Sequence, residues 1–226
     1  MSSSKNANFK DKLKLALDST FKVISDDLQI DNKNKNSKKF DYYELSNLNT
    51  KNDFIKARAE SDSMALKRKF SSDEIYRKNL PLNSSCKSLY SIAEKIRYES
   101  LGGKMLKGIK KNFKDNYNQI ISLKRKDQLK NKDDVTINEA FELYMLKEFH
   151  DIKLNSLTNK MLSFWENELN QSIGKHMDFL KRNLENQNNY SSKFLEIFNQ
   201  MDIFQNEDNE ETKRENQEED KNNPPQ

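Results

Sequence analysis

Cysteine, proline, glycine and histidine are all scarce in this 226-residue sequence, which contains one, three, four and two of them. The single cysteine, Cys86, cannot form a disulfide within the chain, and a lone thiol fits a reducing compartment. None of the glycines lies in the G-x-x-x-x-G-K pattern of a phosphate-binding loop. Neither histidine has a partner at the spacing of a metal site, so we expect no catalytic, cofactor or metal site in this chain.

Long hydrophobic runs are also missing. No stretch approaches the ~18 to 20 apolar residues that a membrane span needs, and residues 1–14 lack the apolar core of a secretory signal. We therefore expect a cytoplasmic protein without a membrane partner.

Charge and aromatic residues are abundant and unevenly placed. The chain has 13 Phe and 8 Tyr, enough to build a core despite a mean hydropathy of -1.07. From Gln205 onward, eight acidic and three basic residues give a charge of -5, which leaves +9 for the rest of a chain whose total is +4. We expect residues 205–226 to be a disordered acidic tail or linker, and the basic body to favour an anionic partner.

Apolar residues recur at three- and four-residue intervals through most of the chain, which predicts a mainly α fold. Helices are expected over residues 8–26, 53–69, 84–101, 105–124, 137–153 and 192–204. Thr136 and Glu139 have the spacing of a capping box, and Gly102-Gly103 predicts a helix end. Apolar and polar residues alternate weakly near residues 28–45, and a short β-hairpin is one interpretation of that pattern. The helical domain spans residues 1–204, with two subdomains as an option if the chain breaks near 126–136.

Isolated residues of chemical interest have structural interpretations that we favour. His150 and His176 are interpreted as surface or boundary histidines, and Cys86 as an inert core thiol on an apolar stripe. Trp165 is interpreted as a core or interface anchor. The lysine-rich runs are typical of solvated helix faces, with an acidic protein or nucleic acid as the alternative partner.

The segment from Arg58 to Lys67 is the least generic in the chain, because Glu60, Ser61, Asp62 and Ser63 are consecutive. Four adjacent side chains cannot converge on a cation without a turn, so helix N-capping or contact with a partner is the better interpretation.

This segment resembles the E-S-D-S-M-A-L stretch of the T subunit of aerobic cobaltochelatase. The resemblance continues through Ile92-Ala93-Glu94, Arg97 to Gly102, Met105 to Ile109, and Asn112. It covers about Arg58 to Asn112, and the rest of the chain matches in layout. Lys67 stands where the family commonly has Arg. Family members also continue past an acidic linker into a von Willebrand factor A-type domain, so we expect a truncated or split N-terminal helical part.

What the resemblance implies is a subunit of an ATP-dependent enzyme that inserts cobalt into the corrin ring during cobalamin synthesis. Its partners would be an AAA+ ATPase subunit and a large corrin-binding subunit, which handle ATP and cobalt. The interface candidates are Glu60, Asp62, Ser63 and Met64, with Lys104, Lys107 and Lys111 along one side of a helix. The alternatives are a basic helical protein associated with nucleic acid, which we consider a poorer fit, or a scaffold for an acidic partner.

Overall fold

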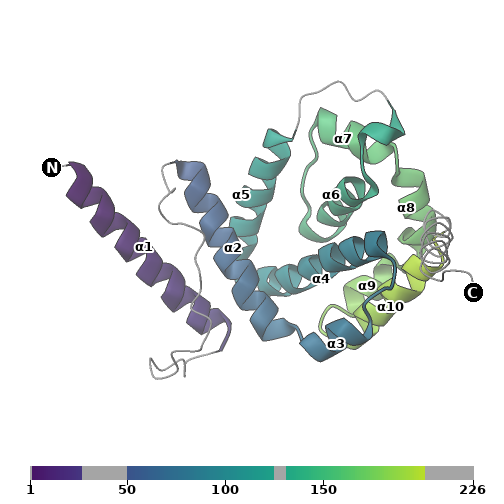
Figure 1. Ribbon diagram of the computed structural model, residues 1–226, viewed down its shortest axis with the longest axis horizontal. Coiled ribbons are helices and arrows are strands. Elements are labelled where there is room, and N and C mark those ends of the chain that lie inside the picture. The colour runs from purple at the N-terminus through teal and green to yellow at the C-terminus, as the bar shows by residue number, and fades with distance from the viewer. Residues whose placement is uncertain (1, 27–49, 125–130, 202–226) are drawn as a thin grey trace, which may run out of the picture.

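The computed structural model describes residues 2–26, 50–124 and 131–201, which form helices joined by short connections and contain no strand (Figure 1). The mainly α prediction is confirmed, whereas the hairpin near residues 28–45 and the tail at 205–226 lie outside the described residues. The elements are α1 (Ser2–Ile24), α2 (Lys51–Phe70), α3 (Asp73–Lys78), α4 (Ser84–Met105), α5 (Lys107–Leu123), η2 (Lys132–Asp134), α6 (Ile137–His150), α7 (Ser156–Ser163), α8 (Glu166–Ser172), η3 (Gly174–His176), α9 (Met177–Arg182) and α10 (Gln187–Asn199).

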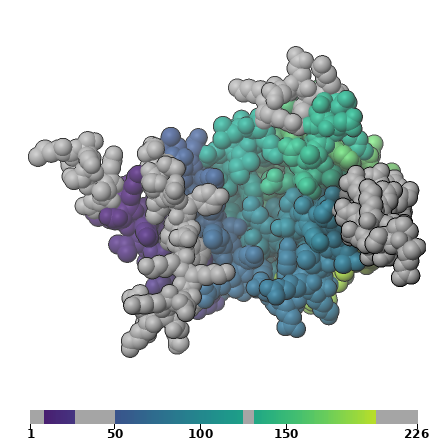
Figure 2. Space-filling model, viewed as in Figure 1, coloured from purple at the N-terminus to yellow at the C-terminus, as the bar shows by residue number. Residues whose placement is uncertain are grey.

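Helix α4 is the centre of the molecule, because α2, α5, α6 and α10 all pack against it. Helix α1 packs on α2 at one end of the molecule, away from α6 to α10 (Figure 1). In the space-filling view, α2, α4 and α5 form one continuous face (Figure 2). None of the helices within the described ranges combines the length and the apolar character that crossing a bilayer requires.

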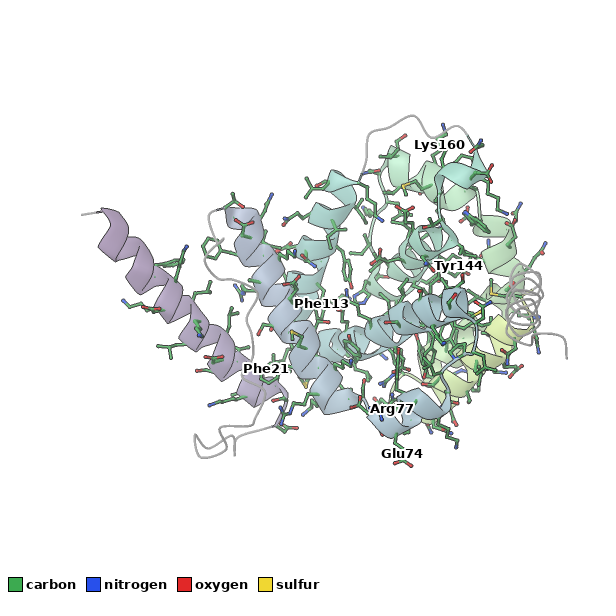
Figure 3. All side chains as sticks on the ribbon, viewed as in Figure 1. Phe21, Glu74, Arg77, Phe113, Tyr144 and Lys160 are labelled. Carbon is green, nitrogen blue, oxygen red and sulfur yellow. The ribbon has the colours of Figure 1, made fainter. Side chains whose placement is uncertain are left out.

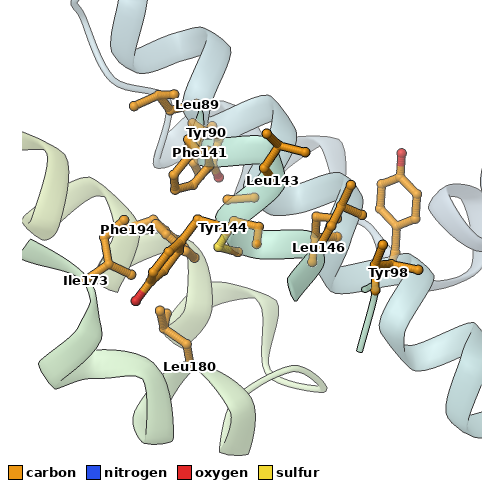
Figure 4. Packing of buried hydrophobic residues seen from close by; sticks show 14 of the residues in the cluster. Leu89, Tyr90, Tyr98, Phe141, Leu143, Tyr144, Leu146, Ile173, Leu180 and Phe194 are labelled. Atoms are coloured by element: carbon orange, nitrogen blue, oxygen red, sulfur yellow. The ribbon is translucent and has the colours of Figure 1, made fainter. Parts of the chain in front are cut away.

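Aromatic and aliphatic side chains together fill the core between α4, α6 and α10 (Figure 4). Phe141 of α6 packs edge-on against Phe194 and Phe198 of α10, with ring centroids 6.2 and 5.9 Å apart. Phe113 is buried, whereas Glu74 and Lys160 are exposed (Figure 3). Core residues from both sides of the predicted break near 126–136 belong to one hydrophobic cluster, so the division into two subdomains stays a prediction.

Side-chain caps fix the starts of α4 and α6. The Thr136–Glu139 capping box is confirmed, since each side chain bonds the other's backbone N–H at 3.3 Å. Asn83 caps α4 by accepting a hydrogen bond from the Cys86 N–H at 3.1 Å. These caps fix the residues at which α4 and α6 begin, and the two helices pack against each other.

The prediction that Gly102-Gly103 ends a helix is wrong, because α4 continues to Met105 and turns at Leu106 in an extended conformation. A Cβ built on Gly102 would lie 2.3 Å from Leu66 Cδ1 and 2.9 Å from Leu66 Cγ. Gly102 therefore allows α2 and α4 to approach closely, and the glycine serves packing instead of capping.

Candidate functional site

Helix α4 buries three charged residues within its otherwise apolar packing surface. Glu94, Arg97 and Glu99 are 3%, 0% and 1% exposed. Burying a charge costs free energy unless the charge is paired and hydrogen-bonded, so we expect each of these three residues to have partners inside the molecule.

Arg97 links three separate segments of the chain. Its Nε donates to Glu94 Oε2 at 3.2 Å, and one terminal nitrogen donates to the Leu184 carbonyl at 3.1 Å. The other terminal nitrogen donates to the Phe70 carbonyl at 2.7 Å and to Ser71 Oγ at 3.0 Å. The guanidinium thereby ties α4 to the end of α2 and to the segment between α9 and α10.

Glu94 completes this centre from the other side. Ser191 Oγ donates to Glu94 Oε1 at 2.7 Å, and Gln187 Nε2 donates to Oε2 at 3.1 Å. The Gln187 amide oxygen in turn accepts from the Ser72 N–H at 2.7 Å. Side chains from α10 bond the Glu94 carboxylate, while Phe70, Ser71 and Leu184 accept from Arg97, so the geometry of this pair is that of a structural connection.

Glu99 forms a second centre between α2, α4 and α5. Ser63 Oγ donates to Glu99 Oε1, and Tyr117 Oη donates to Oε2, both at 2.6 Å. Burial raises the pKa of the Glu99 carboxyl, while Lys95 and the two hydroxyl donors oppose that rise. The centre holds a carboxyl group in an enclosed site with two short hydrogen bonds.

His150, the last residue of α6, adjoins this second centre. The interpretation of His150 as a surface or boundary residue is wrong, because it is 7% exposed and packs against the Tyr117 ring with centroids 5.6 Å apart. Its Nε2 lies 4.0 Å from Glu99 Oε2 and has no hydrogen-bond partner among the described residues. Burial, followed by the positive charges of Lys110 and Lys95, lowers the pKa of His150 to about 4, so the ring is neutral at pH 7.

The residues of the E-S-D-S segment lie within α2 and not at its start, so the N-capping interpretation is wrong. Asp62 is 4% exposed and accepts a hydrogen bond from Asn112 Nδ2 at 2.7 Å, and Ser63 bonds Glu99. Burial raises the pKa of Asp62. Glu60 and Met64 face outward, Glu60 lying 3.7 Å from Lys56 and Met64 being 49% exposed.

The three candidate lysines do not lie along one helix. Lys104 belongs to α4, whereas Lys107 and Lys111 belong to α5, because the chain turns at Leu106 between them. All three are exposed, and Lys111 Nζ is 2.6 Å from Asp115 Oδ2. The use of these seven residues as a partner interface stays a prediction, for which Asp62 and Ser63 are poorly placed because both are buried.

The remaining interpretations concern single residues. Cys86 is 3% exposed in the core, as expected. Trp165 packs partly buried against the core, its Nε1 donates to the Val135 carbonyl at 2.9 Å, and Lys132 lies 3.9 Å from the ring centroid. His176 is half-buried. Among the described residues, no three His, Cys, Asp or Glu side chains gather as a metal site would require.

Sequence reasoning missed the Glu94–Arg97 and Glu99 centres. The available signal was that charged residues at 94, 97 and 99 interrupt a helix whose other residues are largely apolar, small or aromatic. Charges on several faces of one helix indicate that some of them are buried.

Comparison with known proteins gives a result for the family only. Comparisons with curated proteins and with solved structures return no match. The model of the family described as cobalamin biosynthesis protein CobT matches residues 7–226, which is nearly the whole chain. The chain therefore belongs to the CobT family of cobalamin biosynthesis proteins.

Proposed function

We propose that this chain is a subunit of an ATP-dependent cobaltochelatase and acts by binding the AAA+ ATPase subunit of that enzyme. Membership of the CobT family implies a role in cobalamin biosynthesis, and the match over residues 7–226 is the observation that carries the proposal. ATP hydrolysis and cobalt insertion then take place on the partner subunits, and this chain contributes a binding surface.

The corner between α4 and α5 supports this proposal as a contact surface. Met105 and Leu106 are 41% and 47% exposed, and Lys104 and Lys107 flank them in the sequence. Apolar side chains surrounded by charge are the usual composition of a protein interface with a polar rim. The partner face that matches this corner is apolar at its centre and acidic at its edge.

Charge reversal at the corner tests the proposal. The variant Lys104→Glu/Lys107→Glu/Lys111→Glu should lose capture by the ATPase subunit, mainly through a slower association rate and most strongly at low salt. Cobalt insertion by the reconstituted three-subunit enzyme should fall in parallel. Pull-down and surface plasmon resonance at several salt concentrations measure the first effect, and a metal-insertion assay measures the second.

A matched control reverses three exposed lysines elsewhere on the helices, Lys51, Lys87 and Lys175. The control has the same net charge as the test variant, so equal loss of capture by both would show diffuse attraction to the basic body. Undiminished capture by the test variant would eliminate the corner as the contact surface. Absence of any effect of the wild-type chain on metal insertion would overturn the proposed function itself.

A further inference from the structure

Helix α4 buries two acidic residues, and only one of them has a cationic partner. Glu94 and Glu99 are 3% and 1% exposed. The Glu94 carboxylate lies 3.2 Å from Nε of Arg97. Among the described residues, no lysine or arginine forms an ion pair with Glu99, and the basic side chain nearest to it is His150, whose Nε2 lies 4.0 Å from Glu99 Oε2. An ionised carboxylate without a counter-ion is costly in the interior, so we expect the charge of Glu99 to differ from that of Glu94.

The charged groups around Glu99 oppose one another. Burial raises the pKa of the Glu99 carboxyl more than any single neighbour alters it. Lys95 on the same helix favours the ionised form, whereas Glu142 of α6 opposes it. The Lys95 ammonium lies 5.6 Å from the centroid of the Tyr117 ring and forms no ion pair with Glu99. Tyr98 adds no charge, because burial raises its pKa as well. Desolvation therefore decides the charge of Glu99.

The Nε2 atom of His150 faces this carboxyl and has no hydrogen-bond partner among the described residues. The ring is neutral at pH 7, since burial and the positive charges of Lys110 and Lys95 lower its pKa to about 4 against the opposing charge of Asp151. In a neutral imidazole one nitrogen donates and the other accepts. An accepting Nε2 needs a donor, and a protonated Glu99 can supply one after a movement of about 1 Å.

We propose that Glu99 is a neutral carboxylic acid in the folded chain at pH 7 and donates a hydrogen bond to His150 Nε2. Its Oε2 then accepts from Tyr117 and donates to His150, while its Oε1 accepts from Ser63. One proton thereby satisfies both the carboxyl and the histidine without burying a net charge. Because these side chains come from α2, α4, α5 and α6, loss of the proton at alkaline pH leaves a carboxylate between four helices. The junction is a pH-sensitive connection, and it does not depend on which partner the chain binds.

The position of the ring proton on His150 tests this arrangement in the wild-type chain. The sequence has two histidines, so a His176→Gln variant assigns the ring nitrogen signals in a nitrogen NMR spectrum. At pH 7 the proton of His150 should reside on Nδ1, with Nε2 as a hydrogen-bonded acceptor. A proton on Nε2 would mean that the ring donates to an ionised Glu99, and that result would overturn the proposal.

Glu99→Gln tests the charge of the carboxyl, because an amide has the shape of the neutral acid and keeps a donor and an acceptor. Unfolded Glu99 ionises above its ordinary pKa of 4.5, whereas the folded carboxyl keeps its proton, so only the wild type loses stability as the pH rises to 7. The two proteins should melt close together at pH 4.5, and the variant should melt higher at pH 7 by about 5 °C or more.

Glu94→Gln is the matched control, because Glu94 is buried on the same helix and is paired with Arg97. This control should melt below the wild type at pH 7, since the amide leaves the guanidinium without its counter-charge. A lower melting temperature for Glu99→Gln than for the wild type at pH 7 would overturn the proposal. A difference between wild type and Glu99→Gln that stays constant from pH 4.5 to 7 would overturn it too, because the folded carboxyl would then ionise like the unfolded one.

Discussion

Replacing Arg97 by Met removes the guanidinium while keeping an unbranched side chain of similar reach. The substitution eliminates the hydrogen bonds to Glu94, to two backbone carbonyls and to Ser71 Oγ. It leaves the Glu94 carboxylate, 3% exposed, without its cationic partner. Breaking one side of a buried ion pair costs about 3–5 kcal/mol, because the surviving charge and the freed carbonyls stay out of contact with water.

The size of this loss separates a buried connection from a surface ion pair. Urea unfolding followed by far-UV circular dichroism gives the free energy of unfolding of each variant. Arg77→Met is the matched control, since Arg77 on α3 is exposed, and it should change stability by no more than about 0.5 kcal/mol. A loss of less than about 1 kcal/mol in Arg97→Met would mean that water or rearranged side chains bond the groups that Arg97 leaves without a donor. That result would refute the reasoning from burial.

A double-mutant cycle isolates the ion pair from the rest of the network. In Glu94→Gln the neutral amide oxygen still accepts hydrogen bonds from Ser191 or Gln187, so this variant alone should lose less than Arg97→Met. The double variant should be more stable than the sum of the two losses indicates, with a coupling energy of about 1–3 kcal/mol. Strict additivity would show that Arg97 acts only through its bonds to Phe70, Ser71 and Leu184.

Two further predictions concern packing and pH. Gly102→Ala should lower the free energy of unfolding by about 1–3 kcal/mol, because the new methyl group meets the buried Leu66 side chain. Gly108→Ala should raise it by about 0.5–1 kcal/mol, because its methyl group meets nothing within 4 Å. Equal melting temperatures for the two variants would contradict this prediction. The pKa of His150 is about 4 in the folded chain and 6.5 in the unfolded chain, so between these pH values only the unfolded chain binds the proton. His150 therefore makes the free energy of unfolding rise with pH across that window, by about 3 kcal/mol in total. Urea titrations of wild type and His150→Gln should therefore diverge between those pH values and run parallel above them, and parallel curves throughout would exclude a perturbed histidine. The raised pKa of Glu99 acts with the opposite sign above pH 4.5 and is common to both proteins, so the comparison cancels most of it.

The helices could be predicted because each rests on local information. The Thr136 capping box and the apolar stripe that follows it define α6 from fewer than twenty residues. The prediction for α10 was displaced, since the helix begins at Gln187 and not at residue 192. Its first two turns carry Gln187, Tyr190 and Ser191, whose polar groups bond Glu94 and Ala93 of α4. Because these side chains are polar, a buried helix face has the sequence pattern of an exposed one.

Positions whose meaning depends on a distant residue were the ones that sequence reasoning assigned wrongly. Gly102 has the local signature of a helix end, and only the approach of Leu66 from α2 explains it. The Ser-Asp-Ser segment has the signature of an N-cap, and only Glu99 and Asn112 reveal it as an internal contact. His150 looks isolated in sequence, because Tyr117 and Glu99 reach it from other helices.

The buried polar residues also determine where a partner can bind. Asp62, Ser63, Arg97 and Glu99 all belong to the sequence stretches that carry the family resemblance, and each is less than 10% exposed. In this chain those stretches therefore form an internal framework that links α2, α4 and α5. Under the proposed function, contact with another subunit would come from exposed residues that this framework positions. The α4–α5 corner satisfies that condition, because its orientation depends on Gly102 packing against α2 on one side and on the Glu99 centre on the other.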